Sequence, residues 1–122
     1  MATMNYIELP AVDVDAAKAF YSAAFEWDWV DYGPGYASHT AGGLEVALNA
    51  AASIAPPHAP GAQNGVGPLV LFQTTDLTAS EAIVAGAGGS IVSPPYDYPG
   101  GRRFHFADPS GNILGMYQSE AD

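Results

Sequence analysis

The sequence predicts an α+β protein made of two successive β-α-β-β-β halves, and three observations lead to this fold class. Each half opens with a short strand-like segment followed by an aspartate that can cap a helix, Asp13 in the first half and Asp76 in the second. Three strand-like runs follow each helix. A segment rich in alanine, proline and glycine, residues 51–67, separates the halves. We therefore predict a single domain that spans all 122 residues, with a first module at 4–50 and a second at 68–119.

The first module begins with a strand at 6–9, in which apolar and polar side chains alternate. A helix capped by Asp13 or Asp15 comes next. Its apolar stripe consists of Ala17, Phe20, Tyr21, Ala24 and Phe25. Three strands complete the module, and we place them at 27–32, 36–40 and 44–49.

The second module repeats this order. It begins with a strand at 69–73, and a helix capped by Asp76 or Thr78 follows. One side of this helix consists of Leu77, Ser80, Ile83, Val84 and Ala87, and Gly86, Gly88 and Gly89 end it. The remaining strands are expected at 90–93, 103–106 and 113–118. The segment Asp-Pro-Ser-Gly-Asn at 108–112 has the composition of a tight turn between the last two.

Composition excludes several classes of protein. Thirteen acidic residues face only three lysines and arginines, and the net charge of −10 argues against nucleic acids and anionic membranes as partners. The absence of cysteine excludes disulfides and thiolate metal sites. No basic leader followed by an apolar run is visible, and no apolar stretch is long enough to span a bilayer. We therefore expect a cytoplasmic protein.

Three segments in this order carry a family resemblance: AFYSAAFEW, IVSPPYDYPGGR and FADPSGNILGMYQ. Together they resemble the vicinal oxygen chelate superfamily of glyoxalases, bleomycin-resistance proteins and extradiol dioxygenases. The similarity covers essentially the whole chain and is greatest to small proteins related to lactoylglutathione lyase. It implies a glyoxalase-like fold, in which the two modules form an incomplete curved β-barrel, a cup with the helices on its convex face. It also implies a homodimer that binds a small molecule in the cup.

The resemblance implies which of the alternating strand side chains face the helices and which face the pocket. The side chains expected to face the helices are Ile7, Leu9, Phe104, Phe106, Leu114 and Met116. Those expected to face the pocket are Tyr6, Glu8, Arg103, His105, Ile113, Gly115 and Tyr117. A shift of one residue in the register would exchange the two sets.

The same resemblance bears on metal binding. Members that use a metal place His or Glu ligands on the first and last strand of each module. The matching positions in this chain are Tyr6, Leu69, Gly115 and the region of Val46 and Ala47, and none is a good ligand. We therefore expect no metal and no other cofactor. An alternative is a non-standard divalent site built from Glu8, His39, Glu45 and His105, while the third histidine, His58, lies in the linker.

Two residues are candidates for catalysis, Glu8 and His105. Glu8 lies in an otherwise apolar strand; in a partly dry pocket its pKa would rise and it could act as a general base, whereas in a solvent-filled cleft it would have no role. The residues predicted to bind a ligand are Tyr6, Trp29, Tyr36, His39, Leu69, Tyr96, Arg103 and Tyr117. For each aromatic residue the competing interpretation is core packing or a dimer contact, and for His39 and His105 it is a surface or hydrogen-bonded residue. Arg103 could bind an anionic or carbonyl group of a ligand, and its competing interpretation is a surface ion pair.

Three interpretations of function remain open. The first is a small-molecule-binding protein of this superfamily without the usual metal site. The second is a lyase, isomerase or dioxygenase of the same superfamily that uses a non-standard metal or an acid–base step. The third is drug binding that confers antibiotic resistance. Fold does not fix function, so the sequence leaves open whether the protein is an enzyme.

Overall fold

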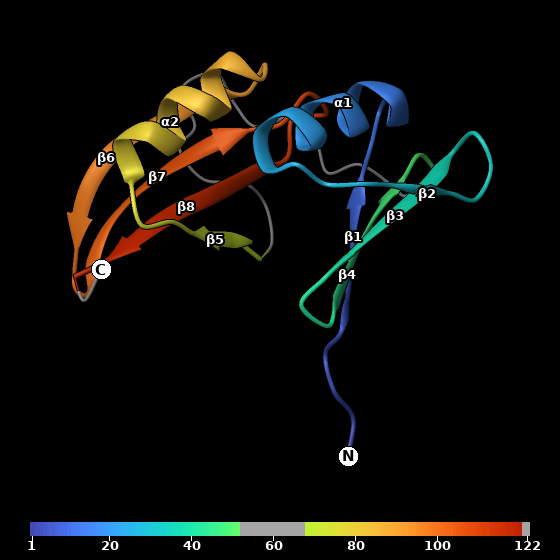
Figure 1. Cartoon of the computed structure of the whole chain (residues 1–122), viewed down its shortest axis with the longest axis horizontal. Helices are drawn as coiled ribbons and strands as arrows, with labels where there is room; N and C mark the ends of the chain where they lie inside the picture. The colour runs from blue at the N-terminus through green and yellow to red at the C-terminus, as the bar shows by residue number, and fades with distance from the viewer. Residues whose placement is uncertain (52–67, 121–122) are drawn as a thin grey trace. The chain divides into compact units, whose positions relative to one another are not determined.

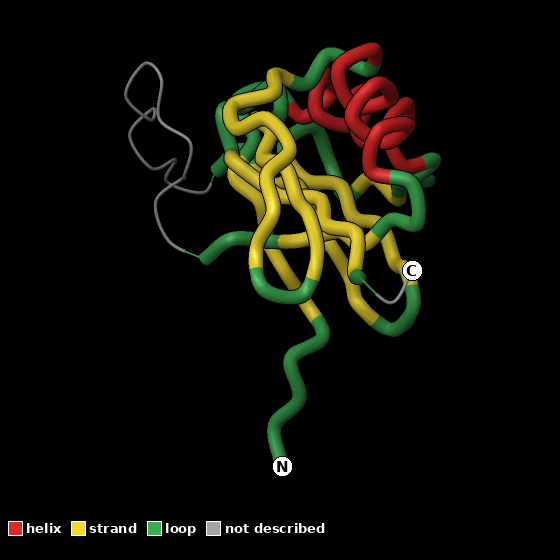
Figure 2. Tube along the Cα trace, turned by 90° about the vertical axis from the view of Figure 1, so that its left-hand side faces the viewer, coloured by secondary structure: helices red, strands yellow, loops and turns green. Residues whose placement is uncertain are grey.

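The computed structural model describes residues 1–51 and 68–120, so most of the predicted linker, with His58, lies outside the described residues. The chain forms two compact units, Met1–Ile54 and Ala55–Asp122, which contain the two predicted modules (Figure 1). Each unit holds one open sheet of four strands and one helix. The first five residues form no helix or strand and extend from the sheet of the first unit (Figure 2). None of the described helices is long and apolar enough to cross a membrane.

The first unit has the predicted order of elements. Its strands are β1 (Tyr6–Pro10), β2 (Val30–Asp31), β3 (Tyr36–Ala41) and β4 (Leu44–Asn49), with α1 (Val14–Phe25) between β1 and β2. They are arranged in the order β1-β4-β3-β2. Strand β1 pairs parallel with β4, and the other pairs are antiparallel. The crossover through α1 and the two following strands permits this parallel pair.

Helix α1 begins where the sequence predicts. The side chain of Asp13 accepts a hydrogen bond from the backbone N–H of Ala16 at 3.1 Å, so Asp13 is the cap and Asp15 lies in the first turn. Glu26 ends the helix in the left-handed conformation, with φ of 60°. The residues that α1 buries are Val14, Ala17, Phe20 and Tyr21.

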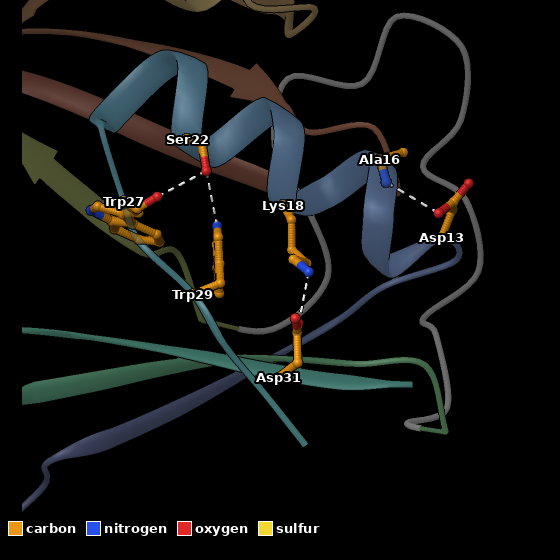
Figure 3. A network of polar contacts seen from close by, with 7 residues as sticks. All are labelled: Asp13, Ala16, Lys18, Ser22, Trp27, Trp29 and Asp31. Carbon is orange, nitrogen blue, oxygen red and sulfur yellow. Dashed lines mark hydrogen bonds and ion pairs between the residues drawn. The ribbon is translucent and has the colours of Figure 1, made fainter. Parts of the chain in front are cut away.

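The strand predicted at 27–32 is wrong in its extent, because only Val30–Asp31 forms a strand. Ser22 of α1 donates a hydrogen bond from its hydroxyl to the carbonyl oxygen of Trp27 at 2.8 Å and accepts one from the indole N–H of Trp29 at 3.1 Å (Figure 3). The Trp27 ring also stacks on Tyr21, with ring centroids 5.2 Å apart. Packing against the helix therefore takes the place of strand pairing in this segment.

The second unit contains β5 (Leu71–Gln73), α2 (Leu77–Gly86), β6 (Ser90–Tyr98), β7 (Gly101–Ala107) and β8 (Ile113–Ser119). Their order in the sheet is β5-β8-β7-β6, with β5 and β8 parallel. Asp76 caps α2 through a 3.0 Å bond from Ala79 N–H. Helix α2 packs against β6, β7 and β8 and buries Leu77 and Val84, whereas Ile83 is 52% exposed and does not belong to the apolar side.

The predicted turn between β7 and β8 is confirmed in detail. The Asp108 carboxylate accepts hydrogen bonds from the backbone N–H of Ser110 and of Asn112, both at 2.9 Å. Its second oxygen accepts the Asn112 amide, also at 2.9 Å. Gly111 has φ of 89°, which a residue without Cβ adopts freely.

Strand β6 is longer than the predicted 90–93, since it continues to Tyr98 through Pro94 and Pro95. Proline is tolerated here because β6 is an edge strand. Its pairing with β7 shifts twice, between Ile91 and Ser93 and again between Ser93 and Tyr96. The prolines that favoured an early end thus belong to a bulged region of the strand.

The register of β7 and β8 confirms which predicted residues share a face. Phe104 pairs with Met116 and Phe106 with Leu114, and both phenylalanines are fully buried. The opposite face is formed by the pairs Arg103 and Tyr117, His105 and Gly115, and Ala107 and Ile113. The pairing therefore confirms which of the predicted residues share a face, while residues of both faces are buried, His105 and Ile113 among them.

Candidate functional site

A hydrogen-bonded group of four side chains lies on one face of the first sheet. The Tyr6 and Tyr36 hydroxyls are 2.5 Å apart. Tyr36 donates to Glu8 Oε2 at 2.9 Å, and the Asn49 amide donates to Glu8 Oε1 at 3.1 Å. The register explains the grouping, because Tyr36 pairs with Asn49, and Asn49 lies two residues beyond Ala47, the partner of Glu8. The sequence-predicted residues Tyr6, Glu8 and Tyr36 are thus brought together.

The environment of Glu8 is the reverse of the dry pocket in which its pKa would rise. The side chain is exposed, and hydrogen bonds from Asn49 and then Tyr36 lower the pKa of its carboxyl group. The pKa of Tyr36 is raised, first by its hydrogen bond with Tyr6, then by burial and by Glu8. At neutral pH the group therefore combines an ionised carboxylate with a protonated Tyr36. A carboxylate with a lowered pKa is a weak general base but a good acceptor.

Glu8→Gln should destabilise the protein at pH 7, and the deficit relative to wild type should shrink in acid. The two hydrogen bonds favour the ionised carboxylate, so their stabilisation is fully present above the ordinary pKa of 4.5 and is lost as pH falls through the lowered pKa. Urea unfolding of both proteins between pH 3 and 7 measures this difference. Glu45→Gln is the control, since the Glu45 carboxylate makes no hydrogen bond among the described residues. A deficit that grows in acid would contradict the assignment.

The second sheet carries a cationic and aromatic group on β6 and β7. The Arg103 Nε–H donates to the Tyr96 hydroxyl, and the Tyr96 hydroxyl lies 3.2 Å from His105 Nε2. The Arg103 guanidinium carbon also lies 5.5 Å from the Tyr96 ring centroid and 4.9 Å from that of Tyr98. These distances are typical of cation–π contacts. His105 is 2% exposed, so it forms the buried end of the group.

The bulge in β6 creates this arrangement. Ser93 pairs with His105 and Tyr96 with Arg103, although the β6 residues are three apart and the β7 residues two apart. Regular alternation would place Ser93 and Tyr96 on opposite faces. The extra residue at Pro94–Pro95 restores Tyr96 to the Arg103 face, and Tyr98 follows two residues later.

The three lysine and arginine side chains differ in how their charge is balanced. Lys18 forms an ion pair with Asp31 at 2.7 Å (Figure 3), and Arg102 pairs with Asp97 at 2.9 Å. Arg103 forms no ion pair within the described part of the chain. The competing interpretation of a surface ion pair therefore applies to Arg102 and not to its neighbour.

Two predicted ligand-binding residues lie elsewhere. His39 pairs with Val46 and thus lies on the face opposite Tyr36, where its ring stacks on Trp27 with centroids 4.7 Å apart. Its Nδ1 lies 2.8 Å from the Asp28 carbonyl oxygen, and its buried Nε2 has no hydrogen-bond partner among the described residues. Trp29 joins the same aromatic cluster through the Trp27 and His39 rings. This placement supports the core-packing interpretation for Trp29 and the interpretation of His39 as a hydrogen-bonded residue.

The family's metal positions in the second unit do not fit a metal ligand. A Cβ at Gly115 would clash with Leu71 Cδ2 and lie 3.5 Å from the His105 ring. The side chain of Leu71, the pairing partner of Gly115, therefore occupies the space that a ligand at position 115 needs. Leu69 just before β5 is half-buried and offers no donor atom.

The corresponding positions in the first unit fit no better. Tyr6 uses its hydroxyl in the bond with Tyr36, and Val46 and Ala47 have no donor atoms. Over residues 1–51 and 68–120, no group of three His, Asp or Glu side chains is arranged to hold a metal ion. The donor set present at these positions is therefore unsuited to a divalent cation.

Gly115→Ala should lower the free energy of unfolding by no more than about 1 kcal/mol, because the new methyl group meets only the end of the Leu71 side chain, which is 40% exposed and can turn aside. In a Leu71→Ala background the same change should cost much less. Urea unfolding of the four proteins gives the coupling between the two sites, expected at about 0.5 kcal/mol or more. An equal cost in both backgrounds would show that Leu71 does not occupy the space.

Asn49 was not predicted from the sequence, whereas Tyr98 is among the aromatic residues that the resemblance implies for the lining of the cup. Tyr96 and Tyr98 alternate within one extended segment, so they are expected to share a face. For Asn49 the signal was weaker: it ends the last strand of the first module, and only the pairing with β3 brings it to Glu8.

Comparisons with known proteins agree with this fold. The model of the Glyoxalase/Bleomycin resistance protein/Dioxygenase superfamily matches residues 3–116. Curated relatives named "Putative glyoxylase CFP32", from Mycobacterium bovis and Mycobacterium tuberculosis, are 32% identical over 96% of this chain. The chain spans about half the length of these relatives, 46%.

Solved structures with a similar fold agree with these matches. A glyoxalase-related enzyme from Fulvimarina pelagi aligns with a TM-score of 0.78 at 19% identity, over 98% of this chain and 89% of that one. The antibiotic binding protein TnmS3 from Streptomyces sp. CB03234 aligns with a TM-score of 0.69 at 25% identity, over 98% of each chain. With the family model matching most of its length, the chain belongs to the Glyoxalase/Bleomycin resistance protein/Dioxygenase superfamily.

Proposed function

We propose that this protein binds a small organic molecule and does so without a metal at the usual positions of its superfamily. The observation that carries the proposal is the pair Gly115 and Leu71, in which an apolar side chain fills the place of a last-strand ligand. The polar and aromatic side chains beside it support a binding role, because small-molecule sites combine apolar surface with a few polar anchors. The similarity to an antibiotic binding protein supports the same class of function, and we include drugs among the proposed ligands.

A thermal-shift screen of small aromatic acids, amides, amines and antibiotics, run with and without EDTA, tests this proposal. We expect at least one compound to raise the melting temperature by the same amount in both conditions, because no metal takes part in binding. Stabilisation that disappears with EDTA and returns on adding Zn²⁺, Ni²⁺, Mn²⁺ or Fe²⁺ would contradict it.

A second candidate function is metal-independent acid–base catalysis of the lyase or isomerase type. The chain of hydrogen bonds from Tyr6 through Tyr36 to Glu8 favours it, because such a chain can move a proton between hydroxyl and carboxylate groups. The lowered pKa of Glu8 counts against it. The assay is conversion of the hemithioacetal of glutathione and methylglyoxal to lactoylglutathione. Loss of turnover in Glu8→Gln or His105→Ala, with the fold intact, would favour the enzyme.

The assembly and partners follow from the same proposal. We expect the protein to form a homodimer, as its resemblance to the superfamily implies. We also expect it to bind neither nucleic acid nor membranes, because a net charge of −10 opposes anionic polymers and surfaces. Light scattering coupled to size-exclusion chromatography measures the first expectation. A mass of one chain at all concentrations would contradict it.

A further inference from the structure

The guanidinium of Arg103 is held in place but is not neutralised. Its Nε–H is used by the Tyr96 hydroxyl, and the Tyr96 and Tyr98 rings lie within cation–π distance. Its two terminal nitrogens have no hydrogen-bond or ion-pair partner among the described residues. A half-buried, positioned guanidinium with its outer N–H groups available is preorganised for a planar oxyanion, which it can bind through two parallel hydrogen bonds.

Tyr117 lies directly beside this cation. It pairs with Arg103 across β7 and β8, so both side chains project from the same face of the sheet. Tyr117 is half-buried, and within the described residues its ring makes no aromatic contact and its hydroxyl no hydrogen bond. A flat, partly covered ring without a protein partner suits a flat ligand. The neighbouring Leu71, 40% exposed, adds apolar surface on this face.

We propose that Arg103 and Tyr117 form a subsite for an aromatic carboxylate, whose carboxylate binds the Arg103 guanidinium and whose ring packs on Tyr117. The inference rests on the proposed function and names its ligand class. A carboxylate is favoured over a phosphate because this face offers one unpaired cation on a chain of net charge −10. One guanidinium balances a single negative charge and would leave the second charge of a phosphate unbalanced. A cationic ligand would be repelled by Arg103.

Calorimetric titration with 2-naphthoate and with its neutral analogue 2-naphthamide tests the inference. Wild type should bind 2-naphthoate about tenfold or more tightly than the amide. Arg103→Met should weaken 2-naphthoate about 10- to 100-fold and leave the amide nearly unchanged. Arg102→Met is the matched control, because it removes the same charge from an adjacent residue that is paired with Asp97. Its affinity for 2-naphthoate should stay within about twofold of wild type.

Two further variants separate the contributions. Arg103→Lys keeps the charge but loses the planar fork, so its affinity should fall between those of wild type and Arg103→Met. Tyr117→Ala should weaken both probes, since both use the ring. Melting temperatures measured on the same samples show whether each variant is folded, and the Arg103→Lys comparison tests the inference if Arg103→Met is not.

The outcomes separate this inference from the proposed function. Equal binding of 2-naphthoate and 2-naphthamide, unaffected by Arg103→Met, would overturn the carboxylate subsite and leave metal-free binding standing. Equal losses in Arg102→Met and Arg103→Met would overturn it too, since the effect would then be one of general charge. No binding of 2-naphthoate to wild type would overturn the ligand class named here. Binding of either probe only with an added divalent metal would instead contradict the proposed function.

Discussion

Phe104→Ala is expected to lower the free energy of unfolding by about 3–5 kcal/mol, the largest effect of any change considered. Phe104 is 0% exposed in the middle of β7, where its ring centroid lies 6.1 Å from that of Phe106. It pairs with Met116 on β8, so the sheet on both sides limits how far the structure can close over the lost ring. Urea unfolding followed by circular dichroism measures the change.

Ile83→Ala is the matched control for Phe104→Ala. Ile83 is also a large apolar residue of the second unit, but it is 52% exposed on α2. Its replacement should cost well under about 1 kcal/mol, because little apolar surface returns to water. Similar costs for the two variants would contradict the assignment of Phe104 to the core and with it the register of β7.

Gly101→Ala is expected to cost about 1–3 kcal/mol and to impair the Arg103 site as well. A Cβ at Gly101 would clash with the Gln118 carbonyl oxygen and lie 3.1 Å from both the Gln118 carbonyl carbon and the Ser119 Cα. These are backbone atoms of β8, so they can give way only if the strands separate. Gly101 pairs on its other side with Tyr98, whose ring lies over Arg103. We therefore expect weaker binding of 2-naphthoate in addition to the loss of stability.

Gly86→Ala provides the comparison for Gly101→Ala. Gly86 is the last residue of α2, and a Cβ there meets no atom within 4 Å. Alanine should stabilise this position by up to about 0.5–1 kcal/mol and leave ligand binding unchanged. Equal effects of the two substitutions on unfolding or on binding would show that the close contact of β7 with β8 does not matter.

Local signals in the sequence predicted much of the fold. Asp13 and Asp76 cap the two helices because a carboxylate one residue before a helix can accept its first free N–H groups. The turn after β7 was predicted for the same kind of reason, since Asp108 bonds residues only two and four positions away. Such interactions are short-range in sequence and do not depend on distant parts of the chain.

The errors concern contacts between neighbouring elements that compete with local strand propensity. The tryptophans at 27 and 29 have high strand propensity, but contacts with Ser22 and Tyr21 of α1 decide their structure. Pro94 and Pro95 resemble the end of a strand, and only the pairing with β7 shows that they lie within a bulge. Local sequence cannot rank such competing tertiary contacts.

Several residues of the two polar groups were singled out from the sequence, but their electrostatics were not. Arg102 and Arg103 are equivalent by composition, yet alternation along β7 separates them and only Arg102 finds a carboxylate, that of Asp97. The pKa of Glu8 is lowered because Asn49 and Tyr36 reach it across the sheet, a cause that the strand containing Glu8 does not reveal.

Metal content tests the central proposal, metal-free small-molecule binding, most directly. The untagged protein is incubated with Ni²⁺, Zn²⁺, Mn²⁺ and Fe²⁺, dialysed without chelator and analysed by inductively coupled plasma mass spectrometry. With glycine and leucine at the second-module positions and no suitable donor at those of the first, we predict far less than one metal ion per chain for every metal. One tightly retained ion per chain, with ligand-induced stabilisation that depends on it, would contradict the proposal.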